Sequence, residues 1–222
     1  MEFCRQFLEC GDAVVAIVRR PDSVSALQLL KEEWPETLHF NFLDVTDFEA
    51  VNAFGREMQS LAIDILINNA GQIGPETHKG EQGQNLETLD PTLIANLTSV
   101  NAIAPLVLTK ALLPSLALAH KPCTFLLGST VGVARETFGD YYAYRMSKAA
   151  GHIAFATLAK DLAKSNILAG VICPGWVKTD LGGPNASLEI DESVRQMIRV
   201  MQNFSPEQNG KFLDFSGRVL EY

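Results

Sequence analysis

The sequence is poor in residues that bind metals. Its 222 residues include only four cysteines, which never adopt Cys-x-x-Cys spacing, and four histidines, which are scattered. Neither pattern is typical of a zinc site, so we assign no metal ligand. The cysteines are expected to be reduced thiols of a cytoplasmic protein: Cys4, Cys10, Cys123 and Cys173.

An excess of positive charge is also missing. There are 18 Lys and Arg against 26 Asp and Glu, which gives a net charge of −8. This balance argues against nucleic acid or an anionic membrane surface as the main partner. No signal peptide or transmembrane run is apparent. With 47% apolar and 20% charged residues, the composition predicts one globular domain over residues 1–222.

Short apolar runs alternate with longer helical patterns along the chain. We expect strands over residues 13–18, 38–43, 63–67, 123–127, 167–173 and 211–215. We expect helices over residues 23–33 (with Ser23 as its cap), 47–61, 91–119, 142–165 and 191–203, and a loop over residues 72–90. Strands that are apolar throughout and separated by helices predict a parallel sheet covered on both faces. The expected fold is therefore the doubly wound, Rossmann-like α/β architecture.

Tyr144 and Lys148 are the most informative pair in the chain. Four residues apart in a helical pattern, their side chains lie on one face within reach of each other. A nearby ammonium favours tyrosinate, so we expect the pKa of Tyr144 to be pulled from about 10 toward neutrality. Such a phenol could exchange a proton with a substrate oxygen. Taken alone, the spacing fits a solvated aromatic–cation pair better.

The other chemically suggestive residues follow the ends of the expected strands. Asp44 ends one strand, Asn69 and Gly71 the next, and Ser129 another, and residues 174–179 follow a fourth. Because the carboxyl ends of parallel strands lie at one edge of a sheet, these positions should converge on one crevice.

Several motifs occur in a fixed order: Asp44-Val45, Asn68-Asn69-Ala70-Gly71, Asn101, Ser129, Tyr144-x-x-x-Lys148 and Pro174-Gly175. As a set they resemble the short-chain dehydrogenase/reductase family over nearly the whole chain. The sequences of residues 142–148 and 174–183 are similar to those of the C-factor and sniffer-like carbonyl reductase branch of this family.

The resemblance implies four catalytic residues. Tyr144 would be the general acid/base, and Lys148 would lower its pKa and hydrogen-bond the nicotinamide ribose. The Ser129 hydroxyl would polarise the substrate carbonyl, and Asn101 would hold a water in a proton relay behind Lys148. Ser129 is chosen over Thr130 because it precedes Gly132 by three residues, although its separation from Tyr144 is two residues longer than is usual. The alternative for Asn101 is a helix residue satisfied by its own backbone.

The resemblance also implies a nicotinamide cofactor. Asp44 and Val45 would flank its adenine, Asn69, Ala70 and Gly71 would follow the ribose, and Val177 and Thr179 would hold the carboxamide. Pro174 and Gly175 complete this set, with Tyr144 and Lys148 at the nicotinamide end. Arg19 and Arg20 lie where NAD-selective enzymes place an acid, so they favour the 2′-phosphate of NADP over NAD. Two solvated arginines are the alternative.

A first strand and a Gly-rich phosphate-binding turn are expected in this family, and the sequence has neither before residues 13–18. Residues 1–8 resemble the later part of the helix after that turn, and Gly11 reads as a helix-end glycine. The chain is thus interpreted as N-terminally incomplete, either because its true start lies upstream or because it is a natural short form. Without the central strand, residues 13–18 should pair with 38–43 and residues 63–67 with 123–127, in a sheet of two parts.

Two functions of different class remain. The first is an NADP-dependent oxidoreductase that interconverts a small-molecule carbonyl and alcohol. The second is a non-catalytic interaction or signalling protein on a truncated dehydrogenase scaffold. A homodimer is kept open as its assembly state, and the sequence does not identify the substrate.

Overall fold

The computed structural model describes residues 1–20, 25–75, 81, 83–136 and 139–222. Its strands form two separate sheets. The first sheet pairs β1 with β2, and the second has the order β3-β4-β5-β6-β7. The strands of the described residues are β1 (Val14–Val18), β2 (Leu38–Phe42), β3 (Ile65–Asn68), β4 (Cys123–Leu127), β5 (Leu168–Cys173), β6 (Phe212–Asp214) and β7 (Val219–Leu220).

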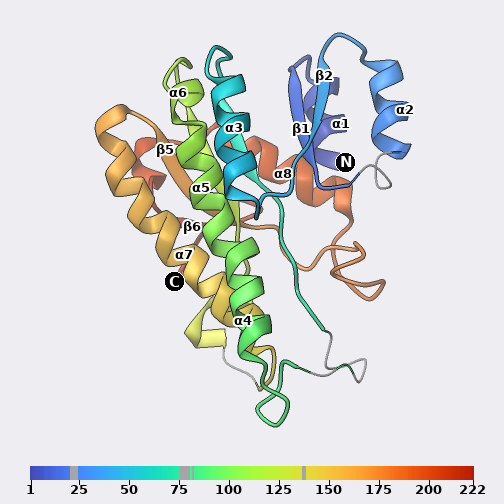
Figure 1. Cartoon of the computed structure of the whole chain (residues 1–222), viewed down its shortest axis with the longest axis vertical. Coiled ribbons are helices and arrows are strands. Elements are labelled where there is room, and N and C mark those ends of the chain that lie inside the picture. The colour runs from blue at the N-terminus through green and yellow to red at the C-terminus, as the bar shows by residue number, and fades with distance from the viewer. Residues whose placement is uncertain (21–24, 76–80, 82, 137–138) are drawn as a thin grey trace.

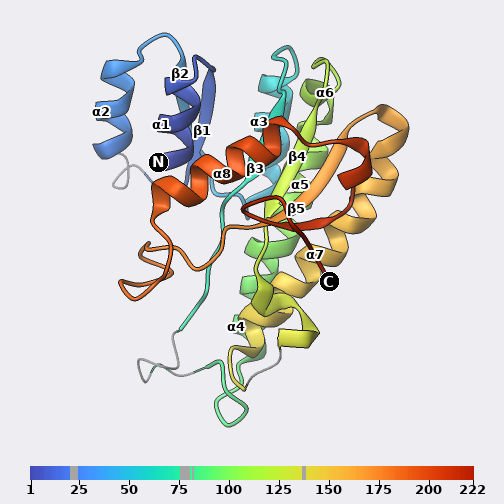
Figure 2. The same cartoon turned by 180° about the vertical axis from the view of Figure 1, so that it is seen from behind.

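Helices cover both faces of the larger sheet, which makes the fold a doubly wound α/β architecture (Figures 1 and 2). The α-helices described are α1 (Glu2–Glu9), α2 (Ser25–Glu33), α3 (Phe48–Met58), α4 (Pro91–Thr98), α5 (Ala104–Ala111), α6 (Leu113–Leu116), α7 (Tyr142–Leu162) and α8 (Ile190–Gln202). α3, α5 and α7 lie on one face and α8 on the other.

The two-part sheet confirms the predicted strand pairing. Val14 pairs with Leu38 in a parallel ladder, and Ile65 pairs with Cys123 in another. Within the described residues, no ladder joins β1 to β3. Each of these strands therefore has one edge without a neighbouring strand, which leaves its backbone groups there outside the sheet ladders.

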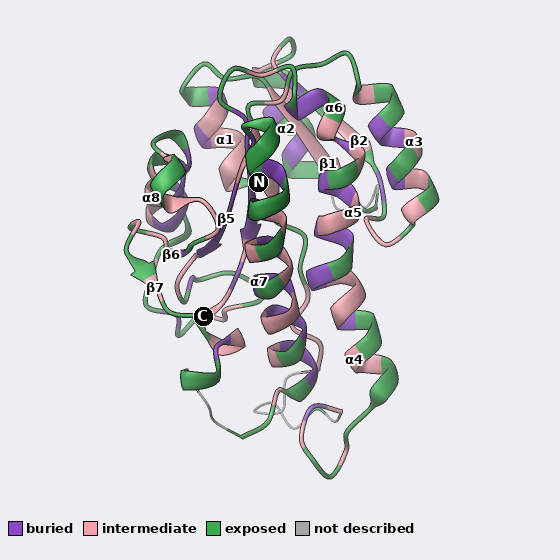
Figure 3. Ribbon diagram, turned by 90° about the vertical axis from the view of Figure 1, so that its left-hand side faces the viewer, coloured by how far each residue is buried: buried purple, intermediate pink, exposed green. Residues whose placement is uncertain are grey.

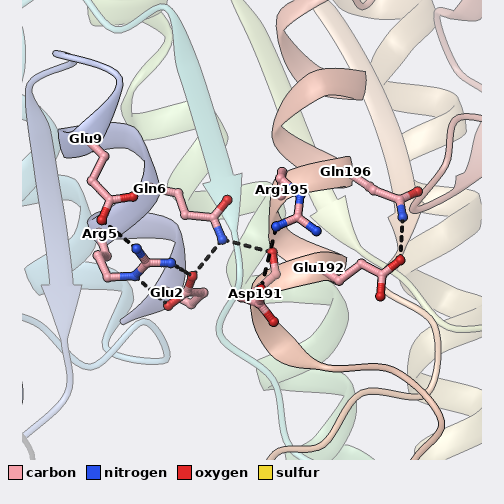
Figure 4. Close-up of polar contacts among 8 residues, drawn as sticks. All are labelled: Glu2, Arg5, Gln6, Glu9, Asp191, Glu192, Arg195 and Gln196. Carbon is pink, nitrogen blue, oxygen red and sulfur yellow. Dashed lines mark hydrogen bonds and ion pairs between the residues drawn. The ribbon is translucent and has the colours of Figure 1, made fainter.

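Helix α1 links the two sheets. Phe3 and Phe7 pack against the core between α8 and the larger sheet, whereas Leu8 packs against the β1–β2–α2 core. The buried Gln6 side chain adds a polar link, because its Nε2 donates to the backbone oxygen of Asp191 at 2.9 Å (Figure 4). Gly11 ends α1 with a φ of +87°, as expected for a helix-end glycine.

A shared core holds the sheets together on the opposite face. Val15 and Ile17 of β1 contact the same cluster as Leu66 of β3, and Phe54 of α3 is buried in that cluster. A second cluster places Phe155 of α7 against the larger sheet. In Figure 3 the buried residues run along β5 and form stripes on α5 and α7. Most residues of α2 are exposed.

The structure corrects the predicted helix over residues 91–119. It is divided into α4, a π-helical turn over Ser99–Ile103, α5 and α6. Pro114 lies in the first turn of α6 and lacks the N–H that would continue α5. The π-helical turn carries Asn101, whose amide bonds outside its own helix. π-Helical turns of this kind are frequent at functional sites.

Strand β7, which has two residues and pairs antiparallel with β6, was not predicted from the sequence. Its length is too short for an alternating pattern to show. Ser23, expected to cap α2, lies outside the described residues.

By length and composition, the described residues contain one helical run that could cross a membrane, Pro91–Ala111, and it packs against α3 and α7 as a core helix does.

Candidate active site

Tyr144 and Lys148 lie on one face of α7, near the carboxyl ends of β4 and β5. Both side chains are buried, with 8% and 7% of their surface exposed. The Lys148 Nζ lies 5.8 Å from the centroid of the Tyr144 ring. The pair is therefore not the solvated aromatic–cation pair that its spacing alone would favour.

The ammonium of Lys148 is held at the end of β4. Its Nζ donates a 2.9 Å hydrogen bond to the backbone oxygen of Leu127, the last residue of that strand. A Cβ added to Gly71 would lie 3.6 Å from the same Nζ, so the glycine keeps the space beside the ammonium free of a side chain. Burial lowers the pKa of Lys148 to about 8.

Ser129 stands opposite the phenol. It caps a short 3₁₀ turn over Thr130–Gly132, and its hydroxyl accepts from the Val131 N–H at 3.4 Å. The surroundings of the phenol shift its pKa in two directions. Burial raises the pKa of Tyr144 to about 12, whereas a hydrogen bond with the Ser129 hydroxyl acts to lower it.

The expectation that Lys148 would pull the pKa of Tyr144 toward neutrality is therefore wrong for this structure. The desolvation of the buried phenolate is the largest cause of the raised pKa, and it exceeds the opposing effect of the Ser129 hydrogen bond. Tyr144 consequently carries its proton throughout the neutral pH range.

Asn101 orders the chain beside Lys148. Its fully buried amide accepts from the Gln72 N–H at 2.9 Å and donates to the Gln72 oxygen at 2.8 Å. The remaining N–H donates to the Ser147 hydroxyl at 2.8 Å. Both N–H groups of the Asn101 amide therefore bond to residues outside the helical turn that carries Asn101. The proton-relay role stays a prediction.

The segment after β3 lies beside this cluster. Asn69, Ala70 and Gly71 are exposed at the sheet edge. A Cβ on Gly71 would approach the Asn101 Oδ1 to 3.3 Å, so the backbone at this point lies close to the Asn101 side chain. The preceding Asn68 is buried and donates to the Phe125 oxygen at 3.2 Å, which ties this segment to β4.

The segment after β5 follows the strand that pairs with β4 on the other side from β3. Gly175 adopts a φ of +81°, and a side chain there would meet the Phe215 ring at 3.1 Å. Pro174 is anchored because its oxygen accepts from the Ser193 hydroxyl at 2.7 Å. Val177 is buried, whereas Thr179 is exposed and its hydroxyl accepts from the Gly182 N–H at 3.0 Å.

The residues expected at the adenine end belong to the smaller sheet. Arg19 and Arg20 follow β1 and are exposed, and Asp44 and Val45 follow β2. Hydrogen bonds from Thr46 hold the pKa of the Asp44 carboxyl below its usual value, and the positive charge of Arg19 acts in the same direction. Arg19 and Asp44 are therefore close enough to interact at the ends of neighbouring strands.

The predicted residues thus occupy the strand ends in two groups. Ser129, Tyr144, Lys148, Asn101 and Gly71 form a compact cluster on the larger sheet, with Pro174, Gly175, Val177 and Thr179 in the loop after β5. The adenine-end residues lie on the β1–β2 sheet, across the edges that no described ladder joins. The donor set suits the nicotinamide–ribose end of a dinucleotide. In residues 1–13, which the structure describes, no Gly-rich turn precedes β1 to supply amides for its pyrophosphate.

Two buried side chains at this site, Gln84 and His152, were not predicted from the sequence. Gln84 caps the start of α7, where its Oε1 accepts from the Tyr144 N–H at 3.0 Å. His152 accepts from the Ser129 N–H through its Nε2 at 3.2 Å. Gln84 lies in a polar segment without any pattern that marks it. His152 had a usable signal, because it follows Lys148 by four residues and shares its helix face.

Fold and site together define an oxidoreductase of the short-chain dehydrogenase/reductase class. The family model of short chain dehydrogenases matches residues 1–189. The chain therefore belongs to this family, and the resemblance inferred from its motifs is confirmed.

Particular relatives agree with this class. The C-signal protein of Myxococcus xanthus is 38% identical over 173 residues, which cover 75% of this chain and 97% of that protein. The carbonyl reductase Sniffer of D. melanogaster superposes with a TM-score of 0.87 at 25% identity, over 95% of this chain and 88% of that one. An NADPH-bound carbonyl reductase from chicken fatty liver gives a TM-score of 0.89 at 27% identity, over 100% and 93% of the two chains.

Proposed function

We propose that this protein is an NADP-dependent oxidoreductase that interconverts a small-molecule carbonyl and the corresponding alcohol, with Tyr144 as the general acid/base. The observation that carries the proposal is the placement of Tyr144. Its buried phenol faces the Ser129 hydroxyl and lies one helical turn from Lys148, whose Nζ is 5.8 Å from the centroid of the phenol ring. A phenol that keeps its proton near neutral pH is a donor for a substrate oxygen.

Three side chains of the protein contribute to the reduction in different ways. The Ser129 hydroxyl donates to the substrate carbonyl oxygen and stabilises the negative charge that develops there. Tyr144 gives its proton to the same oxygen. The positive charge of Lys148, so close to the phenol ring, stabilises the phenolate that is left behind. When bound, the nicotinamide cofactor supplies the hydride.

Other residues would hold that cofactor. The segment after β3 would contact it through Asn69, Ala70 and Gly71. The loop after β5 would contact it through Pro174, Gly175, Val177 and Thr179. Asp44 and Val45 would flank the adenine. Arg19 and Arg20 end β1, where a 2′-phosphate would gain a charge-assisted bond. The NADPH named for the chicken carbonyl reductase supports the same choice.

A second candidate is the non-catalytic interaction or signalling role. It is favoured by the similarity to the Myxococcus protein named C-signal, of which this chain covers 97%. It is favoured also by the two-part sheet, whose β1 and β3 edges are not joined in the described residues. In this role the Tyr144–Lys148 cluster would be retained as part of the core.

A cofactor titration separates these candidates. The 222-residue chain and a version extended at its N-terminus by a strand and a Gly-rich turn are titrated with NADPH and assayed for carbonyl reduction. The proposal expects reduction by the extended protein and its loss in Tyr144→Phe. Reduction that persists in Tyr144→Phe refutes the assignment of the acid. Absence of both binding and turnover in the extended protein favours the signalling role.

A further inference from the structure

His152 lies directly behind the catalytic cluster. It follows Tyr144 by eight residues and Lys148 by four, so the three side chains share one face of α7. Only 2% of its surface is exposed. One side of the imidazole packs on Phe212, with the ring centroids 4.5 Å apart, and the ring of Tyr222 lies 6.1 Å away. These contacts fix the plane of the imidazole.

The imidazole bonds to the backbone of Ser129. Its Nε2 accepts from the Ser129 N–H at 3.2 Å. The preceding amide, Gly128, still bonds to the Ile172 oxygen of β5 at 2.9 Å. Ser129 is therefore the first residue beyond the strand ladder at this point, and His152 supplies the partner for its N–H.

The loop is shaped to fit this ring closely. A Cβ on Gly128 would lie 2.8 Å from the Nε2, and a Cβ on Gly132 would lie 3.1 Å from the Cε1. The first approach is closer than a side chain tolerates, and the second would require the imidazole to shift by a few tenths of an ångström. The two glycines flanking the Ser129 turn therefore let the backbone close around the imidazole.

The bond requires a particular form of the histidine. An Nε2 that accepts must be unprotonated, so the ring is the neutral tautomer with its proton on Nδ1. Burial lowers the pKa of His152 to about 4, and the positive charge of Lys148 acts in the same direction. The acceptor is thus present throughout the neutral range.

We propose that His152 is a positioning residue for the reduction: it holds the Ser129 backbone so that the serine hydroxyl faces the Tyr144 phenol. Ser129 is then fixed at two points, by its N–H to His152 and by its hydroxyl toward Val131 and Tyr144. The proposal rests on the proposed oxidoreductase function. It gives α7 three linked tasks, because one helix face carries the acid, the ammonium and the group that orients the carbonyl donor.

Two substitutions separate the acceptor from the ring. His152→Phe keeps an aromatic ring against Phe212 and removes the acceptor. His152→Gln removes the ring but keeps an acceptor, because its Oε1 is the same number of bonds from Cα as the imidazole Nε2. If His152 positions Ser129, His152→Gln should keep the amide protection and the activity that His152→Phe loses. A purely packing role predicts the reverse order.

The first readout is amide hydrogen exchange of the 222-residue chain, which needs no catalysis. In the unmodified chain the Ser129 amide should be protected. In His152→Phe it should exchange at least about tenfold faster, while the Gly128 amide, bonded to β5, stays protected as an internal control of folding. His152→Gln should retain protection of both. An unprotected Ser129 amide in the unmodified chain, or equal protection in His152→Phe, overturns the proposal.

The second readout is steady-state carbonyl reduction by the N-terminally extended protein. His152→Phe should lower kcat by about tenfold to a hundredfold, because a small displacement of a catalytic group has effects of this size. KM should change by less than about threefold, and His152→Gln should recover most of kcat. Unchanged kcat in His152→Phe overturns the positioning role. If no variant reduces carbonyls, the proposed function fails, and the exchange data still decide whether His152 fixes Ser129.

Discussion

Replacing Gln84 tests how the loop before α4 holds the catalytic helix in place. The side chain of Gln84 is fully buried and makes three hydrogen bonds. Its Oε1 accepts from the Tyr144 N–H at 3.0 Å, and its Nε2 donates to the oxygens of Ile73 and Pro75 at 2.8 and 2.6 Å. The residue before α7, Tyr141, makes no side-chain capping bond, so Gln84 takes over that task.

The expected cost follows from these partners. Gln84→Ala leaves one N–H and two carbonyl oxygens without their present partner, and each lost bond contributes about 1 kcal/mol. We expect the free energy of unfolding to fall by about 3 kcal/mol, which combines three such bonds. Gln84→Met keeps most of the side-chain volume, and should lose a similar amount because the bonds dominate the effect.

Urea unfolding followed by circular dichroism measures this loss. Gln59, which is exposed after α3, provides the matched control, and Gln59→Ala should change the free energy of unfolding by less than about 0.5 kcal/mol. Amide exchange at Tyr144 should also accelerate in Gln84→Ala, because its N–H loses its acceptor. A loss below about 1 kcal/mol with an unchanged denaturant slope would refute the reasoning.

The remaining predictions concern the active site. In the N-terminally extended protein, Tyr144→Phe should lower kcat by at least about a hundredfold while NADPH still binds, measured by steady-state kinetics and calorimetry; near-normal kcat would assign the acid to another residue. Lys148→Met should be more stable than the unmodified chain at pH 7, and this difference should shrink between pH 8 and 10. The reason is that the folded-state pKa of Lys148 is lowered to about 8, so its burial penalty disappears as it loses its proton; urea unfolding at several pH values would show a constant difference if this is wrong. The 222-residue chain should show no micromolar binding of NADPH, because two or three absent amide bonds of about 1.5–3 kcal/mol each weaken binding by roughly a hundredfold or more. Calorimetry that gives a micromolar Kd would contradict this.

The sequence by itself determined the alternation of strands and helices, the division of the sheet and the placement of the predicted residues at strand ends. These features depend on local signals: apolar runs of strand length, glycines and asparagines that stop them, and the four-residue spacing of Tyr144 and Lys148. The pairing of β1 with β2 and of β3 with β4 followed from the strand order of the doubly wound fold, with its central strand absent.

Only the tertiary structure decided the electrostatics and the supporting contacts of the site. Spacing predicted a lowered pKa for Tyr144, but burial by several distant segments raises it, and desolvation is not visible in a four-residue motif. Asn101 bonds to Gln72 and Ser147, and Gln84 caps α7 from sixty positions earlier in the chain. His152 meets Ser129 because two glycines allow the loop to close around its ring. Each of these contacts joins segments that are far apart in sequence, so they cannot be predicted from hydrophobic periodicity or from turn residues.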